Sequence, residues 1–457
     1  MRRVIPTTLI LLAVAGVANA NTAEQWLEDF HFILAEISSH YANLDSVIED
    51  RRVDLPGVRK RTEDRIRAAR DDIEAQRAIE WFMSAFGDGH AYVRWAGPPA
   101  PAGAVEAKPL CQRLGYVSRD FGGINFGRLD DYVPIEDADA AYFPGGVLAG
   151  RTGIVRIHDF SETAHPALCS AAVAALQLSE DAQCESDCPW RVRLRTADLL
   201  TAALERRLKS LQKAGARSIV VDITRNGGGS DWVEPAARVM TPVPLKGSRM
   251  AFVRHPHWVS QLEQRAADVS GNERAVSVFS RAAKEAGKPC DRSGLWADPP
   301  KQPGCSQLVV SEFYATGFLP YAKPGSLDGI PNRNVLFNPS QYRYKEGTNR
   351  LPLTVLVDGG TASAAEYFAA ILQDNKAAKI VGLPTRGSGC GHTNGGIFVN
   401  LPNSRGRLAL PDCARMRADG SNEVLGVMPD VLVPWRDFDS AHQRAARAAA
   451  VLLRPIR

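Results

Sequence analysis

The stretch Ser218-Ile-Val-Val-Asp222-Ile-Thr-Arg-Asn226-Gly-Gly-Gly229 joins a continuous apolar strand to three consecutive glycines. Such a strand is typical of a sheet that is covered on both faces. Because glycine lacks a side chain, the loop that follows can approach a ligand closely and present backbone N–H donors to it. A plain flexible turn explains the glycines equally well when the loop is considered alone.

Further strands and helices alternate around this stretch. Strands are expected over 153–157, 353–357 and 380–381, and helices over 197–214 and 361–372. Strand–helix–strand units with short connections imply a mainly parallel sheet. The sequence therefore predicts an α/β core over 151–440, with an insertion rich in proline and aromatic residues at about 241–350.

The segments outside this core have other patterns. Residues 21–95 are expected to form a helical domain, because apolar residues recur there at three- and four-residue steps up to the turn Gly87-Asp88-Gly89-His90. Residues 96–150 are expected to form a linker and a small β region. A C-terminal helix is expected over 441–457.

The first 20 residues have the pattern of a secretory signal peptide. Arg2 and Arg3 precede a short apolar run from Thr8 to Val17, and Ala18-Asn19-Ala20 supplies a small-x-small cleavage site. We therefore expect an exported protein, located in the periplasm or outside the cell. No later apolar run approaches the ~18 residues that a membrane-spanning helix needs, so no integral membrane segment is expected.

Length, composition and charge agree with a globular protein. The chain has 457 residues, of which 45% are hydrophobic and 23% charged, and its formal net charge is +4. These values exclude a disordered or collagen-like chain. Because no run of Lys or Arg is present, we expect no nucleic-acid partner. A homo-oligomer is compatible with the sequence, which does not decide the oligomeric state.

The eight cysteines fit an exported protein. An even number in an oxidising compartment indicates disulfides, in this case four. We expect Cys290–Cys305, which would close a proline-rich loop, and Cys390–Cys413, which would join two C-terminal segments. The sequence leaves the pairing of the other four cysteines open. A zinc site is disfavoured, because no histidine follows them at zinc-finger distance.

Ser363 lies in a second loop of chemical interest. It follows a buried strand and the pair Gly359-Gly360, and it precedes the first turn of a helix. The unpaired N–H groups and the positive end of a helix dipole favour developing negative charge at such a place. A serine there is equally well explained as a simple N-cap.

Four motifs, taken in order, resemble one known family. They are Ser218–Gly229, Val357-Asp-Gly-Gly-Thr-Ala-Ser363-Ala-Ala-Glu366, Val381-Gly-Leu-Pro-Thr385-Arg-Gly387 and Gly426-Val-Met-Pro-Asp430. This series resembles the tail-specific or C-terminal-processing serine peptidases, whose core also occurs in the tricorn protease. The resemblance covers about residues 151–435. It implies a ClpP/crotonase-like fold of stacked ββα units, a peptide or protein substrate, and Ser363 as nucleophile.

One departure from this family indicates which general base is used. The lysine-dependent branch carries its base in Pro-Thr-x-Gly-Lys-Gly, and Ser388 occupies that lysine position here. A serine hydroxyl cannot replace an amine as base. The tricorn-like branch instead uses a histidine from the helical region and a glutamate before Gly-Val-x-Pro-Asp, positions that His90 and Glu423 occupy. The resemblance thus implies Ser363, His90 and Glu423 as the catalytic residues, in the manner of other Ser–His–acid systems.

A second departure concerns the link between His90 and Glu423. In the tricorn branch a serine precedes the histidine, whereas residue 89 is glycine here. Either Glu423 reaches His90 directly, or Asp88, Ser388 or a water molecule completes the link.

The oxyanion of the reaction needs two N–H donors. By resemblance these are Gly228 and Ala364, with Gly229 as an alternative to Gly228. No metal ion and no cofactor are expected for this chemistry.

Other residues have simpler explanations. His255-Pro256-His257 is interpreted as part of a loop, because no acidic or cysteine partner lies near it in the sequence. His392 is a candidate for lining the catalytic pocket. The aromatic residues of the insertion are expected to pack its interior rather than to shape a substrate groove; they are Trp258, Phe313, Tyr314 and Phe318.

Two other classes of function compete with a peptidase. A non-catalytic protein that binds a lipophilic or peptide ligand would have the same fold, and Gly89 and the lack of a recognisable peptide-tethering module favour it. Acyl-CoA chemistry of the crotonase type shares the two-donor oxyanion site, but export into a compartment without coenzyme A argues against it. The sequence therefore predicts a secreted serine peptidase that forms an acyl-enzyme on Ser363 with His90 as general base.

Overall fold

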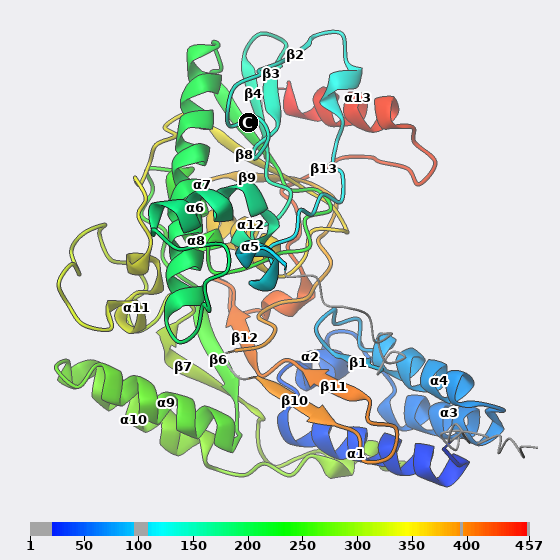
Figure 1. Cartoon of the computed structure of the whole chain (residues 1–457). Coiled ribbons are helices and arrows are strands. Elements are labelled where there is room, and N and C mark those ends of the chain that lie inside the picture. Colours follow the sequence, from blue (N-terminus) through cyan, green and yellow to red (C-terminus); the bar gives the residue numbers. More distant parts are fainter. Residues whose placement is uncertain (1–20, 96–107, 394–395, 455–457) are drawn as a thin grey trace, which may run out of the picture.

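A seven-stranded sheet lies in the upper part of the molecule as drawn in Figure 1, with the strand order β13-β9-β8-β5-β4-β3-β2. The computed structural model describes residues 21–95, 108–393 and 396–454. The expected signal peptide and residues 96–107 of the expected linker lie outside these residues.

Five strands of this sheet run parallel, and two antiparallel strands complete one edge. The parallel strands are β4 (Thr152–Arg156), β5 (Ser218–Asp222), β8 (Leu353–Val357), β9 (Lys379–Gly382) and β13 (Val431–Leu432). The antiparallel strands are β2 (Tyr132–Pro134) and β3 (Gly145–Leu148). The expected α/β class with a mainly parallel sheet is confirmed. The sheet also includes β2 and β3, which come from the segment 96–150 that precedes the expected core.

Helices cover both faces of the sheet, which explains why the strands are apolar at consecutive positions. Val221 packs in a cluster with residues of three helices, whereas the adjacent Val220 packs on the opposite face. The first face carries α7 (Cys188–Lys213), α8 (Val233–Val239) and α12 (Ala364–Asp374). The second carries α13 (Ala441–Leu452) and the short 3-10 helix η1 (Phe126–Arg128).

Helix α7 begins at Cys188 rather than at the expected residue 197. Its first turns lack an apolar stripe, and they are held by a small cluster in which Val192 packs with Cys169 and Val173. These two residues belong to α6 (Pro166–Ala175), which follows the 3-10 helix η2 (Glu162–Ala164). The neighbouring α5 (Leu110–Arg113) completes this cluster. A tertiary contact therefore extends the helix beyond its sequence pattern.

Four N-terminal helices pack against a three-stranded antiparallel sheet of order β1-β11-β10 (Figure 1). The helices are α1 (Ala23–His40), α2 (Leu44–Glu49), α3 (Leu55–Ala68) and α4 (Asp72–Ser84). The strands are β1 (Tyr92–Arg94), β10 (Ile397–Asn400) and β11 (Arg407–Leu410). Since β1 pairs with β11, the turn between α4 and β1 that contains His90 is tied to the C-terminal part of the chain.

The insertion of the core forms its own layer of structure. It contains β6 (Arg249–Val253), α9 (Pro256–Asp268), α10 (Glu273–Ala286), η3 (Ser293–Trp296), β7 (Leu308–Tyr314), α11 (Arg333–Leu336) and η4 (Asn338–Gln341). Strand β6 lies between β7 and β12 (Cys413–Met416), and the 3-10 helix η5 (Glu423–Leu425) follows β12. Trp258, Phe313 and Phe318 are buried in one cluster, which confirms the expected packing role for these three aromatic residues. Tyr314 is half-buried outside this cluster and lines a surface cavity.

The described residues contain four disulfides. Cys290–Cys305 and Cys390–Cys413 are confirmed. The pairs that the sequence left open are Cys111–Cys169, which links α5 to α6, and Cys184–Cys188, which closes the start of α7. Within the described part of the chain, no helix is both long and apolar enough to cross a membrane.

Candidate active site

Ser363 lies in a sharp turn between strand β8 and helix α12. Its backbone has φ 56° and ψ −120°, a conformation that costs a residue other than glycine about 1–3 kcal/mol. Strained strand-to-helix turns of this kind expose the hydroxyl of nucleophilic serines. The Ser363 Oγ lies 3.1 Å from the Nε2 atom of His90, so the hydroxyl faces the imidazole across the turn.

The imidazole of His90 contacts Ser363 on one side and a backbone carbonyl on the other. Its Nδ1 lies 2.8 Å from the carbonyl oxygen of Ser388. Because a carbonyl oxygen only accepts hydrogen bonds, Nδ1 carries the ring proton and donates it there. The Nε2 atom of the neutral ring is then an acceptor, and it faces the Ser363 hydroxyl.

The carboxylate of Asp88 holds the turn on which His90 lies. Its Oδ1 accepts the backbone N–H of His90 at 2.9 Å. Its Oδ2 accepts the Tyr41 hydroxyl at 2.9 Å and the Asn43 amide at 2.8 Å. Burial, aided by the Asp88 charge, raises the pKa of the Tyr41 phenol well above its usual range, so this hydroxyl remains a donor. Asp88 thus supports the backbone of the turn, and its contacts do not include the imidazole ring.

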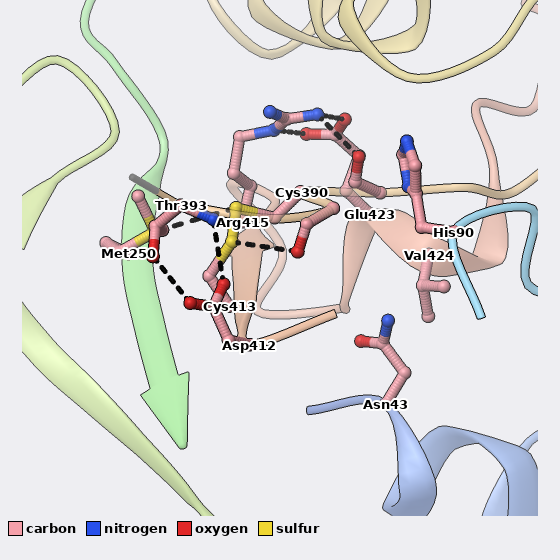
Figure 2. Close-up of a disulfide and its surroundings, with 12 residues drawn as sticks. Asn43, His90, Met250, Cys390, Thr393, Asp412, Cys413, Arg415, Glu423 and Val424 are labelled. Atoms are coloured by element: carbon pink, nitrogen blue, oxygen red, sulfur yellow. Dashed lines mark hydrogen bonds and ion pairs between the residues drawn. A yellow bond between two sulfur atoms is a disulfide. The ribbon is translucent and has the colours of Figure 1, made fainter. Parts of the chain in front are cut away.

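Glu423 is fully buried and binds Arg415 (Figure 2). The guanidinium donates to both carboxylate oxygens, at 2.8 and 2.6 Å, which is the bidentate geometry of strong Arg–carboxylate pairs. The same guanidinium donates to the carbonyl of Gly389 at 2.9 Å. The structure therefore brings Ser363 and His90 together and pairs Glu423 with Arg415, beside the segment that contacts His90.

Ser388 occupies the space that a side chain at residue 89 would need. A Cβ atom added to Gly89 would lie 2.8 Å from the buried Oγ of Ser388. This contact explains why residue 89 is glycine while Ser388 occupies the adjacent space. The atom of Ser388 that contacts His90 is nevertheless its backbone carbonyl.

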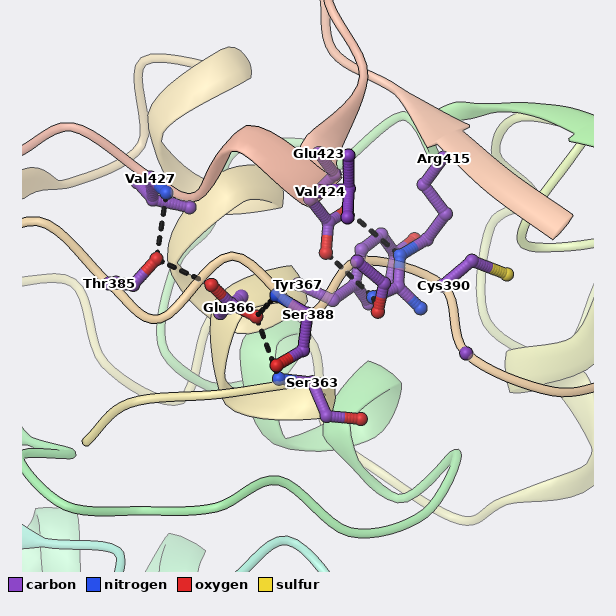
Figure 3. A network of polar contacts seen from close by, with 12 residues as sticks. Ser363, Glu366, Tyr367, Thr385, Ser388, Cys390, Arg415, Glu423, Val424 and Val427 are labelled. Carbon is purple, nitrogen blue, oxygen red and sulfur yellow. Dashed lines mark hydrogen bonds and ion pairs between the residues drawn. The ribbon is translucent and has the colours of Figure 1, made fainter. Parts of the chain in front are cut away.

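Glu366 joins Ser363 to the segment that carries Ser388 (Figure 3), a role that the sequence analysis did not predict. Its Oε2 accepts the backbone N–H groups of Ser363 and Ser388 at 2.9 and 2.8 Å. Its Oε1 accepts the Thr385 hydroxyl at 2.7 Å and the Gly387 N–H at 2.6 Å. Burial raises the pKa of the Glu366 carboxyl above its usual range, although the hydrogen bonds from Thr385, Ser388 and Gly387 oppose the shift. The spacing of three residues from Ser363, typical of a capping box, is the sequence signal for this role.

Two backbone N–H groups beside Ser363 are free to bind a ligand. The N–H of Gly228 donates to the Asn226 side chain at 2.9 Å. The N–H groups of Gly229 and Ala364 have no acceptor among the described residues, and both residues line the cavity next to Ser363. Gly228 instead allows the glycine loop to lie close to the Ser363 side chain, since a Cβ atom at residue 228 would lie 2.7 Å from the Ser363 Cβ.

A cavity of about 390 Å³ lies over the Ser363–His90 pair. His392 lines this cavity as expected, and its ring centroid lies 5.7 Å from that of His90. Burial, together with the nearby His90, lowers the pKa of the His392 imidazole. The loop expected at His255-Pro256-His257 is instead the start of α9, with His255 as the N-cap, and His257 Nε2 lies 3.2 Å from the Asp412 carboxylate. No group of three or more metal-ligating side chains occurs in the part of the chain that the structure describes.

Comparison with known proteins gives the family. The model of peptidase family S41 matches residues 151–433. A Chlamydia pneumoniae protein is 30% identical over 226 residues, which are 47% of this chain and 33% of the relative. The carboxy-terminal-processing protease of Bartonella bacilliformis is 33% identical over 87 residues, 19% of each protein. The chain thus spans a third or less of the length of these relatives.

A solved structure supports the same fold. The structure of mature CPAF matches with a TM-score of 0.53 and 13% sequence identity, and the match covers 94% of this chain and 96% of the other. At this identity the likeness concerns the fold alone. Since the family model covers more than half of the chain, and its residues include the strands and loops that carry Ser363, the chain belongs to peptidase family S41.

Proposed function

We propose that this chain is an exported serine peptidase that hydrolyses peptide bonds through an acyl-enzyme on Ser363. The observation that carries the proposal is the contact of 3.1 Å between the Ser363 hydroxyl and His90 Nε2. Nδ1 of the same ring donates to the Ser388 carbonyl, which leaves Nε2 ready to accept a proton. Nucleophile, base and a group that orients the base are the elements of nucleophilic catalysis by serine.

In the first step, His90 Nε2 takes the proton of the Ser363 hydroxyl as its Oγ attacks the peptide carbonyl carbon. The carbonyl oxygen becomes negative, and the N–H groups of Gly229 and Ala364 are placed to donate to it. The imidazolium then gives its proton to the leaving amine, and the acyl group stays on Oγ. A water molecule, deprotonated by His90, releases the acyl group as a carboxylic acid and restores Ser363.

Glu423 has a positioning role in this proposal. Its carboxylate neutralises Arg415, and Arg415 holds the Gly389 carbonyl at 2.9 Å. Gly389 follows Ser388, whose carbonyl fixes the tautomer of His90. Glu423 thus acts on His90 through Arg415 and the backbone of this segment, and a backbone carbonyl takes the place that a carboxylate holds in most Ser–His–acid systems.

Export is the second part of the proposal. The signal-peptide pattern of residues 1–20 and the four disulfides support an oxidising location, the periplasm or the exterior of the cell. Fractionation of producing cells, with Edman sequencing of the mature N-terminus, tests this part. Recovery of reduced, unprocessed protein from the cytoplasm would contradict it.

A fluorophosphonate probe tests the catalytic part. We expect covalent labelling of the wild type and none of Ser363→Ala, and strong loss of labelling in His90→Ala. Digestion of an unbiased peptide library by the wild type, compared with Ser363→Ala, then reveals the cleavage products. A folded wild type that neither reacts with the probe nor cleaves any library peptide would contradict the proposal and favour a binding protein.

A further inference from the structure

Arg265 lies at the junction of two cavities, one of which contains the Ser363–His90 pair. It belongs to the last turn of α9 and lines the catalytic cavity. It also lines a second cavity of about 540 Å³ that α9 borders. Ala315 and Asn338 line both cavities as well, so the two cavities adjoin; together they are called the groove, and Arg265 lies in its wall.

The other charged groups deep in the catalytic cavity are already paired. Glu234 accepts from the Arg238 guanidinium at 2.6 Å and from the Tyr367 hydroxyl at 2.7 Å. Arg415 forms the bidentate pair with Glu423 described above. These groups therefore have no free charge to offer to a substrate.

Asp231 also lines the catalytic cavity, and its negative charge opposes the positive potential of Arg265 there. It is exposed to solvent, and its carboxylate accepts one hydrogen bond, from Asn338 at 3.3 Å. Water screens this exposed charge better than the half-buried charge of Arg265, although Asp231 is the carboxylate that raises the Arg265 pKa most. Asp268, which lines the second cavity, accepts the Gln264 amide at 2.8 Å.

Arg265 has no counter-ion within the described residues: its guanidinium forms neither an ion pair nor a hydrogen bond there, and it lies 6.0 Å from the ring centroid of Phe313. Burial lowers its pKa, while the more distant carboxylates Asp231, Asp268 and Asp412 raise it. Arginine nevertheless stays protonated in proteins and presents a planar fork of N–H donors that matches a carboxylate. An unpaired, half-buried cation is unfavourable until an anion reaches it.

We propose that Arg265 binds a carboxylate of the peptide substrate in this groove. The inference rests on the proposed peptidase function and specifies its substrate class. The carboxylate has two sources in a peptide, an Asp or Glu side chain and the C-terminal α-carboxylate. The fork of Arg265 would bind either of them through two parallel N–H···O bonds.

Matched peptides test the proposal with the full-length mature protein. Pairs differ only as Asp against Asn or Glu against Gln at each position around the cleaved bond, and each is made with a free C-terminal carboxylate or a C-terminal amide. We expect the wild type to prefer the acidic member of one pair, or the free acid over the amide, by at least tenfold in kcat/KM. A preference within a side-chain pair identifies an Asp or Glu side chain as the source of the carboxylate. A preference for the free acid over the amide identifies the C-terminal α-carboxylate.

Variants of Arg265 then assign the preference to this residue. In Arg265→Gln the ratio of kcat/KM for the acidic peptide to that for its neutral partner should fall to about one. In Arg265→Glu the preference should reverse in favour of peptides with Lys at the same position. Lys284→Gln is the matched control, because it removes one positive charge from an exposed position on the adjacent helix α10 and should keep the wild-type ratio. An Arg265→Gln enzyme with the wild-type ratio would overturn the proposal, as would a wild type without any acidic preference.

A binding measurement separates this proposal from the catalytic one. Calorimetry of Ser363→Ala with the preferred acidic peptide and with its amide isostere requires no turnover. Tighter binding of the acid, lost in the double variant Ser363→Ala/Arg265→Gln, supports the Arg265 site even if no peptide is cleaved. Equal binding of the two peptides to Ser363→Ala overturns the site while leaving a peptidase activity of the wild type intact.

Discussion

Replacing Glu366 by Gln should cost about 3–6 kcal/mol of folding free energy and most of the reactivity of Ser363. The carboxylate accepts four hydrogen bonds of 2.6–2.9 Å in a fully buried position. Two come from the backbone of Ser363, the proposed nucleophile, and of Ser388, whose carbonyl accepts from the His90 imidazole. The other two come from Thr385 and Gly387.

The magnitude follows from the chemistry of the amide. Gln keeps the shape of Glu but replaces one oxygen by an NH₂ donor, so that two of the four donors face another donor in either orientation of the amide. A hydrogen bond to a charged group contributes about 1.5–3 kcal/mol, and two such bonds give the loss stated above. The loss is comparable to the whole stability of a marginal domain, about 5–15 kcal/mol.

Two measurements separate stability from reactivity. Urea denaturation followed by circular dichroism gives the free energy of unfolding, and the rate of fluorophosphonate labelling in the native range reports on Ser363. Glu24→Gln is the matched control, because Glu24 is an exposed carboxylate in the first turn of α1. Its replacement should change the unfolding free energy by less than about 1 kcal/mol.

A milder variant keeps the test informative if Glu366→Gln does not fold. Thr385→Val removes one donor to Glu366 and also the acceptor of the Val427 N–H, so it should cost at least about 1.5–3 kcal/mol, with a smaller loss of labelling rate. Wild-type stability and labelling in both Glu366→Gln and Thr385→Val would refute the reasoning, since the four contacts would then hold neither the fold nor the site.

Three further predictions concern other parts of the molecule. Gly391→Ala should lower kcat at least tenfold in steady-state assays, because the new Cβ would lie 3.0 Å from Cε1 of His90 and the backbone φ of +77° disfavours alanine; an unchanged kcat would contradict the contact. The double variant Cys390→Ser/Cys413→Ser should lose about 3 kcal/mol of stability, because the disulfide closes a loop of 23 residues. Thermal unfolding of the variant and the wild type, with and without reductant, measures this loss. Equal melting temperatures of the two proteins without reductant would contradict it. Burial lowers the pKa of His165 to about 3 in the folded protein, below its unfolded value of about 6.5. The stability that the neutral imidazole contributes is therefore complete above pH ~6.5. It is lost as the pH falls toward 3, at up to about 1.4 kcal/mol per pH unit. Urea denaturation between pH 6.5 and 4 should show that the unfolding free energy falls less steeply with pH in His165→Gln than in the wild type. Equal slopes in the two proteins would exclude His165 as a cause of the pH dependence.

Local patterns in the sequence were enough to predict the core of this fold. The strand Ser218–Asp222 and the strand Leu353–Val357 were expected because a strand buried on both faces is apolar at consecutive positions. The pair Cys390–Cys413 followed from export and spacing, and the family followed from short motifs that keep their order along the chain. Such features are encoded within a few residues, so they do not require knowledge of which segments meet.

Tertiary contacts decided the details of the site. The partner of His90 Nδ1 is a backbone carbonyl 298 residues away, and every residue of the chain has such a carbonyl, so no side-chain pattern distinguishes it. For the same reason the sequence could not show that the Asn226 side chain accepts a hydrogen bond from the Gly228 N–H. The acidic residue Glu423 was placed in the motif by its spacing, but its pairing with Arg415 depends on how β12 and η5 pack.

The sequence by itself thus predicted the α/β core, the family and two of the disulfides, and it proposed Ser363 as the nucleophile, because each of these depends on local periodicity or on residue identity. Only the tertiary structure decided which atoms face Ser363 and His90, and which arginine in the cavity wall has no counter-ion among the residues that the structure describes. The physical reason is that hydrogen bonds and ion pairs depend on distances of about 3 Å between atoms of remote segments, and only packing sets these distances.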